Sequence, residues 1–148
     1  MYTSVLSRRI IDNPTDVLLF NNPTNSSVTV IFRTCTIDYN NKKTSTWRVY
    51  LNPTVSSYGT NIPSIITGNS LTTLAIGQLY VAPVVTSTGI LLREFKIEPY
   101  LNEPTRNQFI LIMPILELSA NSSILLRKKS CHDQGIANIS FIWREIPI

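Results

Sequence analysis

The sequence predicts an all-β protein, an antiparallel β-sandwich of the jelly-roll type with about eight or nine strands in a single domain spanning 1–148. Three observations lead to this class. The chain has 44 β-branched residues (19 Ile, 9 Val and 16 Thr) against four Ala and five Gly, a composition that suits pleated strands and disfavours helices. Turn-forming pairs such as Asn-Pro and Gly-Asn recur at short intervals. The apolar runs between them have strand length, and burying two faces of so many strands requires two packed sheets or a closed barrel.

The N-terminal half contains the first four predicted strands, at 5–11, 17–20, 27–37 and 44–51. Residues 1–11 are apolar, and we expect them to form an N-terminal arm on a neighbouring subunit or an edge strand. In 27–37, period-two alternation predicts that Val28, Val30 and Phe32 take one face. The same alternation predicts the opposite face for Thr29, Ile31, Arg33 and Cys35.

The segment 54–77 departs from this pattern, because it contains apolar residues without sustained alternation. The sequence therefore predicts a long interaction loop or a crossover between sheets. A helical turn is expected only within 70–76. The triplet Asn-Pro-Thr occurs three times but reflects turn chemistry, so no internal repeat is predicted. The apolar side chains of this segment are predicted to contact a neighbour: Tyr58, Ile62, Ile65 and Ile66.

The C-terminal half contributes predicted strands at 78–82, 90–98, 109–118, 123–129 and 137–146. The run 109–113 is apolar on both faces, which predicts a central strand covered on each side or a subunit contact. In the last strand Ile139, Phe141 and Trp143 alternate with the residues between them. Both tryptophans of the chain are predicted core residues. The polar stretch 128–135 is predicted to form a hairpin turn.

Residues for acid–base chemistry are scarce, with one histidine, His132, and nine acidic residues. Cys131, His132 and Asp133 are consecutive, and neighbouring side chains point apart, so they cannot converge as a catalytic triad. One Cys and one His without a second ligand pair are insufficient for a metal site. The nearest carboxylate pair, Glu94 and Glu98, is about 13 Å apart along a strand, too far for glycoside hydrolysis. The sequence therefore predicts no enzyme, no catalytic or metal site and no cofactor.

The net charge of +4 and the pI near 9.3 arise from scattered basic doublets and one triplet, so nucleic acid is not an expected partner. The longest apolar run, eight residues at 109–116, is far shorter than a bilayer span. The N-terminal residues show no export signal, and no membrane partner is expected. The two cysteines, Cys35 and Cys131, are two thiols or one disulfide.

Two stretches of the C-terminal half resemble the ending of small β-sandwich accessory proteins of tailed-phage virions. Residues 116–126 end a strand in small polar residues and begin an apolar one, and 136–145 form a closing strand with a late Glu145. Residues 18–32 resemble the opening hairpin of those proteins. The resemblance implies a capsid cement or decoration protein that binds the major capsid lattice, or a tail or fibre component, and stabilises the particle. It also implies a homo-oligomer that is assembled in the host cytoplasm and located in the virion.

The alternative is a carbohydrate-binding or receptor-binding module of a tail or head fibre. That function would need Trp47, Tyr58 or Tyr100 to be exposed in a row, where their rings can stack on a ligand. For the structural role, the apolar ends of the chain are predicted to pair with neighbouring subunits or to cover a sheet edge. Together with the segment 54–77, these ends complete the predicted partner interface with Val5, Leu6, Ile146 and Ile148.

Overall fold

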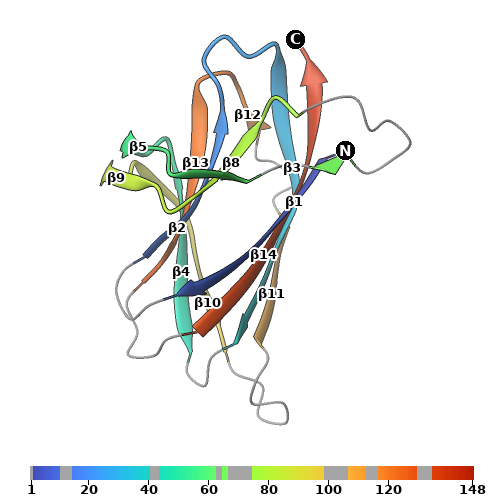
Figure 1. Cartoon of the computed structure of the whole chain (residues 1–148). Coiled ribbons are helices and arrows are strands. Elements are labelled where there is room, and N and C mark those ends of the chain that lie inside the picture. The colour runs from blue at the N-terminus through green and yellow to red at the C-terminus, as the bar shows by residue number, and fades with distance from the viewer. Residues whose placement is uncertain are drawn as a thin grey trace.

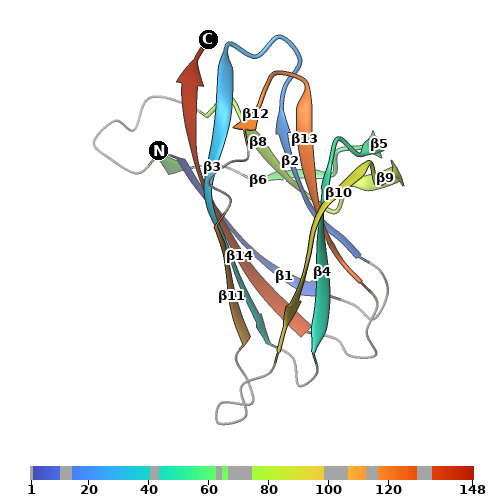
Figure 2. The ribbon, with the colours of Figure 1, turned by 180° about the vertical axis from the view of Figure 1, so that it is seen from behind.

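The computed structural model describes residues 2–10, 15–40, 44–62, 65–66, 75–98, 107–112, 117–129 and 135–148. Strands form the regular structure of these ranges, and none of the ranges contains a helix, which confirms the predicted all-β class. Apart from one two-stranded sheet, the strands belong to two antiparallel sheets that face each other (Figures 1 and 2). Each of the nine predicted strand segments contains a strand of the structure.

Sheet A has the strand order β11-β3-β14-β1-β7, and β12 pairs with β3 farther along that strand. β14 is its central strand and pairs with β3 on one side and β1 on the other. The strands of sheet A are β1 (Tyr2–Ile10), β3 (Val28–Asn40), β7 (Ile65–Ile66), β11 (Asn107–Ile112), β12 (Glu117–Leu118) and β14 (Gly135–Pro147).

Sheet B has the strand order β10-β4-β13-β2-β8-β6. Its two central strands, β13 and β2, pair antiparallel with Leu125 opposite Leu19. The strands of sheet B are β2 (Thr15–Asn22), β4 (Ser45–Leu51), β6 (Thr60–Ile62), β8 (Gln78–Val81), β10 (Ile90–Ile97) and β13 (Ser122–Lys128).

The order of the longer strands is that of a jelly roll. Strands β1, β2, β3 and β4 alternate between sheets A and B, and β10, β11, β13 and β14 resume this alternation. The two facing sheets are therefore β1-β14-β3-β11 and β2-β13-β4-β10, which is the double Greek-key arrangement. The predicted antiparallel sandwich of jelly-roll type is confirmed.

Between β4 and β10 the chain forms an insertion on the outside of the sandwich. β5 (Thr54–Ser57) pairs with β9 (Val84–Ser87) in a two-stranded sheet, the outer ribbon, which lies on the face of sheet B turned away from sheet A (Figures 1 and 2). Strands β6 and β8 extend sheet B, and β7 extends sheet A. The segment 54–77 thus contains three short strands and passes from sheet B to sheet A. Of the helical turn expected at 70–76, only Ala75 and Ile76 are described, and neither is helical.

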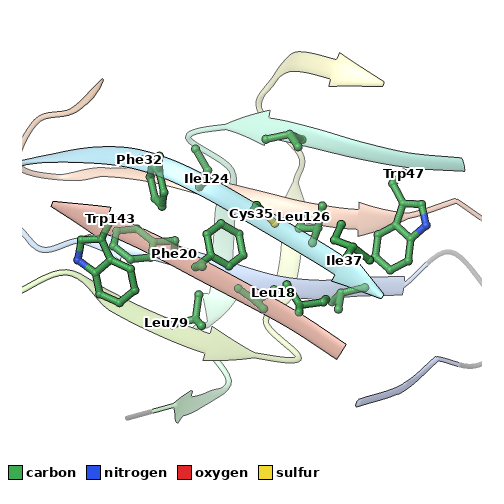
Figure 3. Close-up of a cluster of buried hydrophobic side chains, with 14 of the residues drawn as sticks. Leu18, Phe20, Phe32, Cys35, Ile37, Trp47, Leu79, Ile124, Leu126 and Trp143 are labelled. Carbon is green, nitrogen blue, oxygen red and sulfur yellow. The ribbon is translucent and has the colours of Figure 1, made fainter. Parts of the chain in front are cut away.

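Aromatic and aliphatic side chains together fill the space between the two sheets (Figure 3). The ring of Phe20 lies edge-on to the rings of Phe32 and Trp143, with centroid distances of 4.7 and 4.9 Å. Trp47 and Trp143 are fully buried at opposite ends of this cluster, which confirms the prediction that both are core residues. Truncating a core aromatic of this kind costs about 3–5 kcal/mol, so these rings are a major source of stability.

A β-bulge at Arg33 changes which residues of β3 face the core. Phe32 pairs with Trp143 and Thr34 pairs with Ile142, so Arg33 is an extra residue in the ladder. One extra residue shifts the alternation by one position, and Cys35 is buried on the same side as Phe32. The prediction that Cys35 takes the opposite face is therefore wrong.

Two expected hairpins are connections between sheets. Residues 18–32 contain β2 and β3, and 128–135 join β13 to β14, but in each case one strand lies in sheet B and the next in sheet A. Consecutive apolar strands here bury their inner faces against each other across the sandwich, rather than side by side. The residues Cys131, His132 and Asp133 lie outside the described ranges.

The strand β11 is the outermost strand of sheet A and pairs with β3. Of the two alternatives predicted for 109–113, the central strand is therefore wrong, and the subunit contact remains a prediction. An apolar run on both faces of a strand indicates that the faces are covered, and it carries no information on how many strands flank it. The jelly-roll order determines that position.

Two polar side chains connect distant parts of the fold. Asn22, at the end of β2 in sheet B, is fully buried and donates through Nδ2 to the carbonyl oxygens of Val28 (3.0 Å) and Leu118 (2.9 Å) in sheet A. Glu145 accepts hydrogen bonds from the backbone N–H groups of Ile76 (2.9 Å) and Gly77 (2.8 Å). The first residue ties one sheet to the other, and the second ties the insertion to β14.

Candidate binding surface

The insertion is built as two similar arms, 50–62 and 80–92, which are offset by 30 residues. Each arm leaves a strand of sheet B, forms one strand of the outer ribbon and returns to sheet B. The prediction of no internal repeat is therefore wrong. The repeat has no contiguous motif, because only single, separated residues recur at the fixed offset. The residues that are identical at equivalent positions are Tyr50 and Tyr80, Pro53 and Pro83, Val55 and Val85, Ser57 and Ser87, and Gly59 and Gly89.

The strand pairing of the two arms follows the same offset. In the first arm β6 returns to pair with β8, and Thr60 lies opposite Val81. In the second arm β10 returns to pair with β4, and Ile90 lies opposite Leu51. Thr60 is equivalent to Ile90 and Val81 to Leu51, so the two pairings are the same contact with the arms interchanged. The arms are therefore related by a local two-fold pseudosymmetry axis between β5 and β9.

Both arms turn at the same two backbone conformations. Asn52 and Ala82 have φ angles of 52° and 54°, and Gly59 and Gly89 have φ angles of 92° and 78°. A methyl group added at either glycine would overlap a backbone carbonyl oxygen of the other arm. Glycine is therefore required at both corners of the ribbon.

A small apolar cluster holds the ribbon on sheet B. Leu19 and Leu125 face away from the main core and are fully buried together with the nearly buried Tyr50. One residue from each ribbon strand covers them, Val55 from β5 and Val85 from β9. The residues that both arms share thus form the corners and the contact with the sheet.

Along the β5 edge of the ribbon lies a pocket of about 300 Å³. At its rim, the Tyr58 ring stacks on the Tyr80 ring with a centroid distance of 5.1 Å, and the Tyr80 hydroxyl donates to the Gln78 side chain. Among the described residues, no charged side chain lines the pocket. Its lining is Asn21, Asn52, Pro53, Thr54, Val55, Tyr58, Asn121 and Ser123.

The region that pseudosymmetry relates to this pocket is charged. The backbone N–H of Asn52 donates to the Ser123 carbonyl of β13 (2.8 Å), and the N–H of the equivalent residue, Ala82, donates to the Val17 carbonyl of β2 (3.3 Å). The pseudosymmetry therefore places β2 where β13 lies beside the first arm. By this relation Arg127 takes the place that Asn21 has beside the pocket. Its guanidinium lies 5.8 Å from the Tyr50 ring centroid and bonds to Asp16 through Nε at 2.5 Å, a hydrogen bond that raises the pKa of Arg127.

Three consecutive aliphatic residues at the start of β10 are exposed. Ile90, Leu91 and Leu92 keep 63%, 49% and 42% of their surface accessible, and we call them the β10 patch. The ladder to β4 passes from Leu91 to Arg93, so Leu92 is a bulge residue in the edge strand of sheet B. Farther along, Glu94 accepts a hydrogen bond from Arg48 at 2.6 Å, which lowers the pKa of Glu94.

The predicted partner interface did not include the β10 patch, although the sequence carries a signal for it. Three consecutive apolar residues in a strand cannot all face one core, because side chains alternate. At an edge strand such a run leaves at least one apolar side chain exposed unless something covers both faces. Farther along the same strand, Phe95 and Ile97 alternate regularly and are buried.

The predicted interface residues of the insertion separate into two places. Tyr58 is 48% exposed at a corner of the ribbon, whereas Ile62 is partly buried against the main core. Ile65 and Ile66 form β7 and pair with Thr3 and Tyr2 of β1.

The predicted interface residues near the chain ends lie in sheet A. Val5 and Leu6 belong to β1 and pair with Ser140 and Ile139, so this strand covers an edge of β14 in its own chain. Ile146 is partly buried in β14, and Ile148 is 84% exposed beyond its end. The structure does not bring the eight predicted residues together on one surface.

The described residues offer little chemistry beyond binding. Cys35 is a thiol in the core, and burial raises its pKa far above the ordinary value, so it remains protonated. In the described ranges no three His, Cys, Asp or Glu side chains gather as a metal site requires, and no helix has the length and apolar character to cross a bilayer. Trp47 is buried, so an exposed aromatic row cannot include it, and Tyr100 lies outside the described residues.

Comparison with protein-family models, with curated proteins and with solved structures finds no match. The fold and the surface therefore define the class: a jelly-roll sandwich whose β4–β10 connection carries a two-armed outer ribbon.

Proposed function

We propose that this chain is a non-enzymatic structural protein of a virus particle, a cement or decoration protein that binds the capsid lattice and stabilises the particle. The observation that carries this proposal is the β10 patch, with three consecutive exposed aliphatic side chains. Scattered exposed apolar residues are ordinary, whereas a contiguous apolar patch favours a protein contact.

The apolar character of the patch itself favours a long-lived contact. Permanent interfaces are more apolar than transient ones, and their centres contain few charges. The bulge at Leu92 interrupts the free edge of β10, which disfavours the addition of a strand from a partner. The partner, a major capsid chain or a tail or fibre component, is therefore expected to pack on the side chains of the patch, with copies of this chain repeated over the lattice as a homo-oligomer.

Two further observations support the virion part of the proposal. Jelly rolls occur in viral capsid proteins and in lectins, among other classes, so the fold is compatible with the role but does not define it. Residues 116–126 and 136–145 resemble the ending of phage accessory proteins, and the late Glu145 of that resemblance here binds the insertion. Catalysis is not part of the proposal, because consecutive side chains at Cys131, His132 and Asp133 point apart and the Cys35 thiol is buried.

Peptide mass spectrometry of gradient-purified particles tests the proposal. We expect the chain in a fixed ratio to the major capsid protein. Replacing Ile90, Leu91 and Leu92 together by Ser should reduce incorporation about tenfold or more, because the substitution removes the apolar surface buried at the proposed contact.

The matched control is Val84→Ser, which changes an equally exposed aliphatic residue of β9 outside the patch (55% exposed) and should incorporate normally. Circular dichroism confirms that both variants fold. Absence of the chain from purified particles, or normal incorporation of the triple variant, would overturn the proposal.

A further inference from the structure

We infer that the pocket along the β5 edge binds a neutral saccharide, with the Tyr58 ring and the amide groups of Asn52 and Asn121 as its recognition elements. This inference does not depend on the capsid role, because the pocket and the β10 patch share no residue.

The charge of the pocket determines the ligand class. All eight lining residues are uncharged, and six of them carry an amide or a hydroxyl group. An anionic ligand such as a phosphate would be expected to recruit Arg or Lys, as phosphate sites generally do. A neutral ligand with several hydroxyl groups matches these donors and acceptors. The pocket volume of about 300 Å³ is at the lower end for small-molecule pockets, which suits a single sugar unit.

The amide groups are held so that their NH₂ groups can serve a ligand. The Asn52 side-chain oxygen accepts a hydrogen bond from the Ser123 backbone N–H at 3.0 Å. The Asn121 side-chain oxygen accepts one from the Thr24 hydroxyl at 2.9 Å. Both oxygens are engaged within the protein, and among the described residues neither NH₂ group has a partner. Each NH₂ group can therefore donate to a sugar hydroxyl without losing a bond in the protein.

The aromatic rim is held in place before a ligand arrives. The Tyr58 ring is 48% exposed and lines the pocket, and the Tyr80 ring stacks against it. A positioned ring offers a flat apolar surface on which the C–H face of a sugar can pack, and little freedom is lost on binding. Asn52 and Tyr58 flank β5 of the outer ribbon, which lies outside sheet B, and Asn121 directly precedes β13 of that sheet (Figure 1).

The pseudosymmetric region provides an internal contrast. There Arg127 replaces Asn21, Ala82 replaces Asn52, Val84 replaces Thr54 and Thr88 replaces Tyr58. The same backbone thus presents one charged and mostly apolar surface and one neutral polar surface with an aromatic rim. Only the second has the groups that a neutral sugar needs.

The test is ¹⁵N–¹H NMR titration with glucose, galactose, mannose, N-acetylglucosamine and N-acetylgalactosamine, followed by a glycan array of neutral and anionic glycans. We expect at least one neutral sugar to shift the amide signals of Asn52, Tyr58, Asn121 and Ser123, with weak affinity typical of one sugar unit. Asn52→Asp keeps the acceptor for Ser123 and the tolerance of positive φ but removes the NH₂ donors, and it should weaken binding about tenfold.

The matched control is Thr88→Ala, which truncates the residue equivalent to Tyr58 in the other arm and should leave the titration unchanged, whereas Tyr58→Ala should abolish it. No neutral glycan bound in either assay, or shifts that map elsewhere, would overturn the inference. Binding restricted to anionic glycans would also overturn it.

Discussion

The two arms of the insertion share a backbone and differ in what they present to solvent. The positions at which 50–62 and 80–92 are identical are the corner glycines, the prolines and the residues that contact sheet B. Several of the positions at which they differ are exposed: Thr60 against Ile90 and Asn61 against Leu91, and Tyr58 is exposed where Thr88 is half-buried. The shared residues therefore serve the fold, and the differing residues are where function can reside. The molecule itself separates these two roles.

The corner glycines provide the strongest test of this equivalence. Gly59→Ala and Gly89→Ala should each destabilise the protein by about 3 kcal/mol or more, because left-handed strain adds to overlap with a backbone carbonyl. Urea denaturation followed by circular dichroism measures the change. If one substitution were tolerated and the other not, the two corners would not be equivalent.

Exchanging the turn residues sharpens the comparison at a smaller scale. Asn52→Ala should destabilise by about 1 kcal/mol, because it removes the hydrogen bond to Ser123 and places Ala at positive φ. Ala82→Asn should stabilise by up to about 1 kcal/mol, because Asn adopts the left-handed conformation more readily than Ala. Thermal unfolding of both variants measures the two opposite shifts. Stability changes of the same sign in the two variants would contradict the equivalent left-handed turn positions assigned to residues 52 and 82.

The smallest expected effect concerns Glu94, a carboxylate of β10 just beyond the second arm. The hydrogen bond from Arg48 lowers the pKa of Glu94, so its contribution to stability is present above the unfolded-state pKa and is lost as the pH falls through the lower folded-state value. Both side chains are substantially exposed, so the change in stability should be slight. NMR titration of the Glu94 carboxyl group should show its pKa rising in Arg48→Gln, and rising less in Lys96→Gln. An unchanged pKa in Arg48→Gln would contradict the pairing.

Composition and turn spacing predicted the fold class and the nine strand segments, because runs of β-branched and other apolar residues between turn residues identify strands in the sequence. The strands β5, β6, β7 and β9 have two to four residues and show no alternation that could identify them. The bulge at Arg33 and the choice between a hairpin and a connection across the sandwich depend on tertiary packing, which local pattern does not encode.

The surface was less predictable than the fold. Tyr58 was identified from the sequence because it lies in an irregular segment, and it forms part of the pocket rim. The amide groups around it come from Asn21 of β2 and from the turns at Asn52 and Asn121, which are far apart in the sequence. The exposure of the β10 patch was not predicted, because the patch begins an otherwise regular strand. Its three consecutive aliphatic residues nevertheless violate the alternation that a single buried face requires.

The position of β13 and β14 has a consequence for how the chain folds as it is synthesised. β13 lies between β4 and β2 in sheet B, and β14 lies between β3 and β1 in sheet A. Until these two strands emerge from the ribosome, the strands before them lack their common neighbours, and neither sheet can close. Strands before residue 113 can pair within parts of each sheet, as β4 does with β10 and β3 with β11, but the two parts of each sheet are joined only at the end of synthesis. A ribosome stalled before 122 would hold a chain without the jelly roll.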